Sequence, residues 1–362
     1  MSRLSHNPQN QFTALWIEPE PGEGSQPRLR ILDDASRSIL SRNESPDIPF
    51  EFSINPYRGC FHGCAYCYAR PTHEFLEMSA GTDFERNIVV KRSAPALLRE
   101  AFEDPSWRGD LVVFSGVTDC YQPLEARFQI TRRCLEVCLE YRNPVGIITK
   151  STLIERDVDL LVALHTQAQV DISISIPIFD PDKARALEPQ VPTPARRLRA
   201  LERLAAAGLP VAINVAPFVP GISEDGLREL LTAARDAGAY RANTIFLRLP
   251  GPVAEVFEHQ VRTRLPLTAE KILSKVRAAR GGRMNDPRFG SRMTGDGPYA
   301  VAALKTFESI ARDVGLAGPQ PEPRPLRKTF RRPSRSAPAK GQLDLFGSTS
   351  SPARPGRSAG RI

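Results

Sequence analysis

Three of the six cysteines lie within eight residues, in a C-x3-C-x2-C arrangement at Cys60, Cys64 and Cys67. A glycine precedes each of the first two, and a tyrosine stands on either side of the third. Thiolates crowded onto a short, glycine-containing loop can converge on a metal ion or a cluster. Three ligands are one short of a closed four-ligand site. The loop therefore predicts a metal or cluster centre with one position left for another molecule.

Length and apolar content bound what surrounds this loop. The 362 residues suffice for one barrel-sized domain or two smaller ones. The sequence has no run of 18 apolar residues, and its first residues lack the apolar stretch of a signal peptide. We therefore expect a cytoplasmic chain without membrane association. In a reducing cytosol, clustered cysteines are more often metal ligands than disulfides.

Short β-branched runs alternate with helical segments after the cysteine loop, which itself follows a predicted strand over 48–54. The predicted strands are Ile88–Lys91, Leu111–Ser115, Val145–Lys150, Val170–Ile176, Val211–Ala216 and Thr244–Leu249. The predicted helices are Ala94–Glu103, Thr131–Tyr141, Leu153–His165, Pro194–Ala207 and Glu224–Ala237, with two more over 268–280 and 298–314. This alternation predicts an α/β fold with a parallel sheet covered by helices. Six or seven such units indicate a full or partial TIM-type barrel, whose active site would lie at the carboxyl ends of the strands.

The charge is concentrated at one end of the chain. Residues 319–362 contain ten Lys or Arg and two acidic residues, so this segment accounts for the whole net charge of +8. It also contains eight prolines, and we expect a disordered basic tail. Residues 1–45 are polar and mixed, and we expect an arm with weak local structure. The predicted core is then 46–318.

Unusual polar residues stand at the predicted strand ends. Thr118, Asp119 and Cys120 follow one strand, and Lys150 ends the next. Two further predicted strands carry polar residues within apolar runs, namely Ser173, Ser175 and Arg248. An ammonium group needs an acceptor carboxylate, a carboxylate needs a cation, and ribose hydroxyls suit a short hydroxyl side chain. These strand ends therefore carry groups that suit a polar, zwitterionic ligand.

The cysteine loop after a first strand, with Tyr66 before the third cysteine, resembles the radical S-adenosylmethionine (SAM) superfamily. The resemblance implies a partial (β/α)6 barrel in which Cys60, Cys64 and Cys67 hold three irons of a [4Fe–4S] cluster. The fourth iron would bind SAM, and one electron from a reductant such as flavodoxin or ferredoxin would cleave SAM to a 5′-deoxyadenosyl radical.

The strand-end residues resemble more narrowly the spore photoproduct lyase-like branch of that superfamily. The resemblance implies that Thr118 and Asp119 take the amino group of SAM and that Lys150 reaches its carboxylate. Ser173 or Ser175 would bind the ribose.

One departure from that branch concerns the hydrogen-atom donor. The branch has a donor cysteine immediately before the Ser/Thr-Asp pair, where this chain has Gly116 and Val117. Cys120 follows the pair and is a candidate donor from the other side. The alternative for Cys120 is a buried small hydrophobic residue. Arg248 either pairs with a buried carboxylate or faces the active site.

The leading functional hypothesis is a radical SAM enzyme, lyase-like in its chemistry, that acts in DNA repair or nucleic-acid modification. A second hypothesis keeps the chemistry but assigns a small-molecule or protein substrate. A third is a zinc-containing nucleic-acid-binding protein without catalysis, with His62 or His73 as the fourth ligand.

The tail carries one apolar cluster, Gln342-Leu-Asp-Leu-Phe346, which resembles the pentapeptide that binds the bacterial DNA sliding clamp. Two leucines and a phenylalanine suit a hydrophobic groove. The surrounding arginines would add salt-dependent attraction to DNA phosphates. The alternative is a solvated tail without a partner.

Overall fold

The computed structural model describes residues 7–12, 28–316 and 328–333. All but Pro333 belong to one compact unit, Met1–Arg332. Its main sheet has seven strands in the order β10-β9-β8-β7-β6-β3-β2. Their bounds are β2 Leu40–Arg42, β3 Phe52–Ile54, β6 Val112–Phe114, β7 Val145–Thr149, β8 Val170–Ser175, β9 Val211–Phe218 and β10 Arg241–Phe246.

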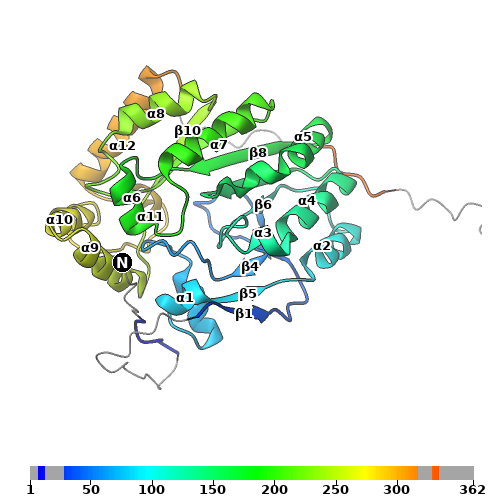
Figure 1. The fold of residues 1–362 in the computed structure, drawn as a ribbon, viewed down its shortest axis with the longest axis horizontal. Coiled ribbons are helices and arrows are strands. Elements are labelled where there is room, and N and C mark those ends of the chain that lie inside the picture. Colours follow the sequence, from blue (N-terminus) through cyan, green and yellow to red (C-terminus); the bar gives the residue numbers. More distant parts are fainter. Residues whose placement is uncertain (1–6, 13–27, 317–327, 334–362) are drawn as a thin grey trace, which may run out of the picture. The chain divides into compact units, whose positions relative to one another are not determined.

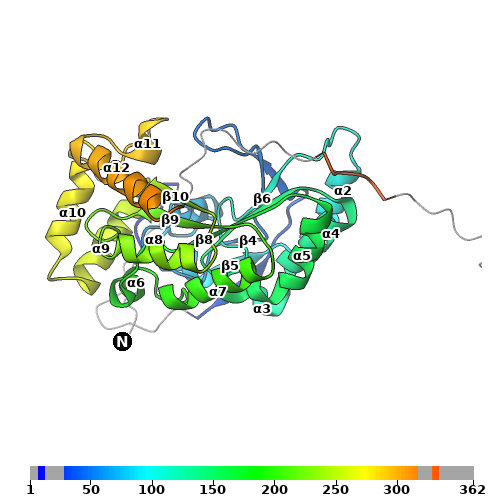
Figure 2. The same ribbon diagram turned by 90° about the horizontal axis from the view of Figure 1, so that it is seen from above.

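Six strands of this sheet are mutually parallel, namely β3, β6, β7, β8, β9 and β10. The seventh strand, β2, is antiparallel to β3 and forms one edge. Figures 1 and 2 show helices following one another around the sheet. The predicted α/β partial barrel with six parallel strands is thereby confirmed. Every strand from β6 to β10 runs toward the same end, so the side chains that follow these strands meet at one edge.

The predicted strand Ile88–Lys91 does not belong to the barrel. β5 (Asn87–Val90) pairs with β1 (Arg30–Asp33) and β4 (Tyr57–Arg58) in a separate three-stranded sheet. Its sequence is as apolar as that of a barrel strand because β5 is also buried. Residues 1–45 also contain more structure than their polar composition predicts, since they contribute β1 and β2.

The predicted helices are present. They are α2 (Ala94–Glu103), α4 (Ile130–Tyr141), α5 (Val158–Gln167), α7 (Pro194–Ala206), α8 (Leu227–Asp236), α10 (Ala269–Ala278) and α12 (Pro298–Asp313). The predicted helix Leu153–His165 is divided into a 3₁₀ turn, η2 (Thr152–Asp157), and α5. Ser151 starts η2 by accepting a hydrogen bond from the Leu153 amide at 3.1 Å.

The remaining helices lie between these elements. They are α6 (Pro181–Leu187), α9 (Val253–Arg264), the short α1 (Thr82–Arg86), α3 (Glu125–Phe128) and α11 (Ser291–Thr294), and the 3₁₀ helix η1 (Arg70–Leu76). In the part of the chain that the structure describes, no helix is both long and apolar enough to cross a membrane.

Residues 328–332 form a strap that packs on the ends of α2 and α4, as the orange-red segment of Figure 1 shows. The Phe330 ring lies 5.9 Å from the Phe102 ring and 6.2 Å from the Tyr141 ring, centroid to centroid. The Arg331 amide donates to the Tyr141 carbonyl at 3.0 Å, and the Arg332 side chain donates to the Phe102 carbonyl at 3.0 Å. These residues lie within the tail predicted to be disordered, and at 328–332 that prediction is wrong.

We predict that Phe330→Ala lowers the free energy of unfolding by about 2 kcal/mol, because a half-buried phenyl ring is lost from an aromatic cluster. Guanidinium unfolding monitored by circular dichroism measures the change. Arg331→Ala is the control, since its side chain is exposed and its backbone hydrogen bond remains. Equal stability of Phe330→Ala and the parent protein would contradict the packing role of the strap.

Candidate active site

The cysteine loop leaves β4 and passes over the carboxyl ends of the barrel strands. Cys60 and Cys64 are buried and Cys67 is half-buried. Two tight turns shape the loop, since the Gly63 amide donates to the Cys60 carbonyl and the Cys67 amide to the Cys64 carbonyl, each at 3.3 Å. Gly59 starts the loop with φ +78°, and a Cβ there would lie 2.8 Å from the His73 ring and the Phe84 carbonyl. Only glycine fits that position.

The three thiols lie close enough to influence one another. Burial raises the pKa of Cys60, Cys64 and Cys67, and for Cys60 and Cys64 the neighbouring thiols raise it further. Thiols with raised pKa values lose their protons when a metal replaces them. Among the residues the structure describes, no three His, Cys, Asp or Glu side chains are placed so that they could bind one metal ion together. In a cluster each cysteine binds its own iron, so three thiols on one loop fit a cluster.

The loop after β6 holds the cysteine loop by side-chain contacts. Gln122 is fully buried, and its amide accepts from the Phe61 amide at 2.9 Å and donates to the Gly59 carbonyl at 3.0 Å. The Thr118 hydroxyl donates to the Tyr57 carbonyl at 2.7 Å. These contacts on both sides of Cys60 fix the first thiol relative to β6.

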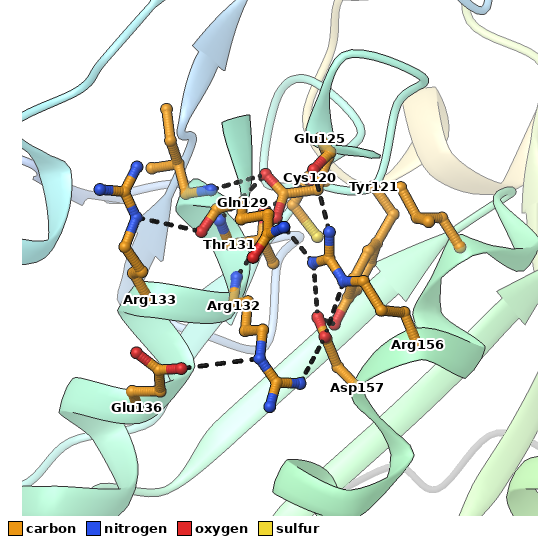
Figure 3. Close-up of polar contacts among 12 residues, drawn as sticks. Cys120, Tyr121, Glu125, Gln129, Thr131, Arg132, Arg133, Glu136, Arg156 and Asp157 are labelled. Carbon is orange, nitrogen blue, oxygen red and sulfur yellow. Dashed lines mark hydrogen bonds and ion pairs between the residues drawn. The ribbon is translucent and has the colours of Figure 1, made fainter. Parts of the chain in front are cut away.

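A buried carboxylate, Glu125, holds Tyr57, the residue whose carbonyl Thr118 contacts. It accepts hydrogen bonds from the Tyr57 hydroxyl and from the Ile130 and Thr131 amides at the start of α4. Figure 3 shows Arg156 completing the set, with its guanidinium 2.9 Å from Glu125. Amides at a helix N-terminus and an arginine are the partners that a buried carboxylate needs.

Two further buried groups hold the other cysteines. Arg70 is fully buried and donates to the Cys64 carbonyl at 2.8 and 3.0 Å. The Tyr66 hydroxyl donates to Glu188, which pairs with the buried Arg197 at 2.6 Å. Arg197 also donates to the carbonyl of Ser175 at the end of β8 at 2.7 Å. The loop is thus tied to the ends of both β6 and β8.

Asp119 lies at the centre of the predicted SAM-contacting residues. Its carboxylate accepts from the Thr149 hydroxyl at 2.7 Å, the Lys150 amide at 2.8 Å and the Tyr121 amide at 2.9 Å. His62 of the cysteine loop lies 3.5 Å away. Asp119 therefore joins the ends of β6 and β7 to the cysteine loop.

The Lys150 ammonium lies beside the cysteines. It is 5.7 Å from the centre of the Tyr66 ring and 3.4 Å from the Ala216 carbonyl. Its charge acts to lower the pKa of Cys64 and Cys67, against the larger effect of burial. A carboxylate bound above the loop would meet this cation.

Ser173 and Ser175 lie on one face of β8, since the neighbouring Ile172 and Ile174 are buried in the core. Ser173 is half-buried, whereas Ser175 is 3 % exposed and pairs in register with Asn214 of β9. The more accessible Ser173 is the better placed of the two for a ligand.

Cys120 lies in the apolar core with no accessible surface. Figure 3 shows it next to Thr131 and Tyr121, and its carbonyl accepts a hydrogen bond from the Thr131 hydroxyl at 2.6 Å. Burial raises the pKa of its thiol. This position fits the packing alternative for Cys120 better than the role of hydrogen-atom donor.

Gly116 lies close to the position at which the spore photoproduct lyase-like branch has its hydrogen-atom donor cysteine. A Cβ atom on Gly116 would lie 2.7 Å from Ser53. The Gly116 carbonyl accepts a hydrogen bond from the Tyr68 hydroxyl at 2.6 Å. At Gly116 itself, the end of β6 therefore offers only a backbone group to the cysteine loop.

The two candidate zinc-binding histidines have other partners. A ring nitrogen of His73 lies 2.8 Å from the Asn87 carbonyl, and its ring packs edge-on against Phe84. His62 faces Asp119, and burial lowers the pKa of His62 against the opposing effect of Asp119.

The fold and the site together define a barrel enzyme with a three-cysteine loop at the carboxyl ends of its strands. The family model "Radical SAM superfamily" matches residues 54–234. The chain belongs to the radical SAM superfamily, which implies a [4Fe–4S] cluster and SAM, and it is an enzyme. The alternative of a zinc-containing protein without catalysis is not supported.

Curated relatives match somewhat more than half of the chain. An uncharacterized protein of Mycobacterium tuberculosis is 38 % identical over 206 residues, which cover 56 % of this chain and 61 % of the relative. An uncharacterized protein of Methanocaldococcus jannaschii is 28 % identical over 195 residues, which cover 54 % of this chain and 70 % of the relative. The match therefore spans about three fifths of the mycobacterial relative.

Solved structures share the fold. Spore photoproduct lyase complexed with dinucleoside spore photoproduct has a TM-score of 0.60 at 18 % identity, covering 84 % of this chain and 87 % of that chain. A variant of that lyase with bound AdoMet and dinucleoside spore photoproduct has a TM-score of 0.57 at 17 % identity, with the same coverage of both chains.

We predict that Gln122→Met lowers the free energy of unfolding by about 2 kcal/mol, because two buried backbone groups of the cysteine loop lose their partners. It also lowers the iron retained per chain after anaerobic reconstitution, because the loop is held less firmly. Denaturant unfolding and iron analysis measure the two effects. The control is Gln167→Met, at an exposed position at the end of α5. Equal behaviour of the two variants would exclude the clamping role.

Proposed function

We propose that this enzyme binds a [4Fe–4S] cluster through Cys60, Cys64 and Cys67 and cleaves SAM reductively. The supporting observation is that the Lys150 ammonium lies beside a three-thiol loop at the carboxyl ends of the barrel strands. When bound, the cluster and SAM supply a 5′-deoxyadenosyl radical after one-electron reduction. A cytoplasmic reductant such as flavodoxin or ferredoxin would deliver the electron.

The residues of the chain bind and orient SAM in this proposal. Lys150 holds its carboxylate, as its place beside the loop favours. Asp119 and Thr118 orient the amino group, with Asp119 kept in place by Thr149. Ser173 donates to the ribose, with Ser175 behind it. The buried Tyr66 shields one side of the loop from water.

We propose a nucleic-acid substrate and a role in DNA repair or nucleic-acid modification. The fold shared with spore photoproduct lyase and the basic segment 319–362 support this choice. The hydrogen atom would come from a group other than Cys120, which is buried in the core. A small-molecule or protein substrate is the alternative.

We predict that Cys64→Ala reduces both bound iron and dithionite-driven 5′-deoxyadenosine to background, because the cluster loses one of three thiolates. Anaerobic reconstitution, iron analysis and chromatography of the nucleoside product measure these effects. Cys138→Ala is the matched control, since this cysteine lies in the core helix α4. Wild-type protein that retains a full cluster but forms no 5′-deoxyadenosine would refute reductive SAM cleavage.

We also propose that Gln342–Phe346 binds the DNA sliding clamp; these residues lie outside the described part of the chain. We predict that immobilised clamp retains the wild type and releases the double variant Leu345→Ala/Phe346→Ala, which lacks the two apolar anchors. Gln320→Ala is a control elsewhere in the tail. Equal retention of all three proteins at 150 mM salt would leave charge alone as the cause of any binding.

A further inference from the structure

Arg248 lies two residues beyond β10, at the same edge of the barrel as the cysteine loop. Its guanidinium carbon is 5.8 Å from the centre of the Tyr68 ring. Tyr68 follows Cys67, and its hydroxyl is held by the Gly116 carbonyl at 2.6 Å. Arg248 is therefore positioned between the cysteine loop and the last strand of the barrel.

Arg248 has no carboxylate within 4.0 Å among the described residues. The one hydrogen-bonding contact of its side chain in that part of the chain is to the Met293 sulfur at 3.7 Å, a weak acceptor. The residue is half-buried. Burial and the charge of Arg292 lower the pKa of Arg248, while Tyr68 and Asp47 act in the opposite direction. Asp47 is itself hydrogen-bonded to Arg292. Among the described residues, Arg248 is thus a half-buried cation without a direct ion pair.

The neighbouring arginine differs in this respect. Arg292 donates to Asp47 at 2.5 Å and lies 4.3 Å from the Phe289 ring centre. The fully buried Arg280 holds this region to the end of β10 by donating to the Leu247 carbonyl at 2.5 Å and the Arg292 carbonyl at 2.9 Å. The residues around Arg248 are therefore held in place by hydrogen bonds.

We propose that Arg248 binds a phosphate group of the substrate and so places the adjoining nucleotide above the cysteine loop. This inference rests on the nucleic-acid substrate proposed above. A guanidinium offers paired N–H donors to two phosphate oxygens. Tyr68 and Phe289 are 46 % and 61 % exposed, and each packs against one of the two arginines. Exposed aromatic rings beside arginine are the combination that suits single-stranded nucleic acid.

Arg248 suits an anion, and two anions are candidates for it. They are a phosphate of the substrate and the carboxylate of SAM. Lys150 already supplies a cation for the SAM carboxylate beside Cys64. A second cation, placed next to Tyr68 and not next to Tyr66, favours the phosphate. The experiment separates the two sources.

The test uses the full-length holoenzyme and the dinucleotide thymidylyl-thymidine, which has one phosphodiester, with its neutral methylphosphonate analogue as the matched probe. Affinities of both probes are measured by calorimetry at 150 mM salt for the wild type, Arg248→Gln and Arg248→Lys. Arg228→Gln is the charge-matched control, because Arg228 pairs with Asp313 on α12. SAM binding and uncoupled 5′-deoxyadenosine formation are measured on the same samples.

We expect the wild type and Arg228→Gln to prefer the phosphodiester by about tenfold, the scale of one charged hydrogen-bonded contact. Arg248→Gln should lose that preference while SAM binding is unchanged, and Arg248→Lys should retain part of it. Equal binding of the two probes by the wild type would overturn the inference, as would weakened SAM binding with an intact preference in Arg248→Gln. Absence of 5′-deoxyadenosine in the wild type would count against the proposed function and leave the phosphate preference to be judged by itself.

Discussion

The active site depends on hydrogen bonds from buried side chains to the backbone of the cysteine loop. A loop of this kind has no helix or strand to define its shape, so its carbonyls and amides need partners from elsewhere. Gln122 supplies a donor and an acceptor on either side of Cys60, and Arg70 supplies two donors to Cys64. These contacts hold the backbone at Cys60 and Cys64 in place.

The same contacts explain why so many charges are buried near the strand ends. Glu125, Glu188 and Arg197 are each at most 1 % exposed, and each has a partner of opposite charge. Burying such pairs gains little stability over apolar packing, since desolvation offsets the attraction. Their value here is geometric, because each pair ends on the cysteine loop or on a strand end. Removing one partner would leave the other charged and buried.

Much of the fold could be predicted from the sequence because the barrel strands are continuous apolar runs and their helices are amphipathic. The three cysteines could be found from spacing, and Lys150 from its place at a strand end. The role of Gln122 could not, because a glutamine in a turn has no periodic pattern and its partners are backbone atoms 61 and 63 residues earlier. The placement of Ile88–Lys91 in the wrong sheet has a similar cause. An apolar run shows that a strand is buried, but not which strand it pairs with.

Phe330 was missed for the opposite reason, since it stands alone among arginines and prolines and its packing partners are far away in sequence. The strap has a mechanical consequence. α12 contacts α8 and α10 beside the last strands, whereas the strap sits on α2 and α4 beside the first ones. The ring of Phe330 contacts Phe102 of α2 and Tyr141 of α4, so it bridges two helices. Any movement that separates the ends of these helices must first release Phe330.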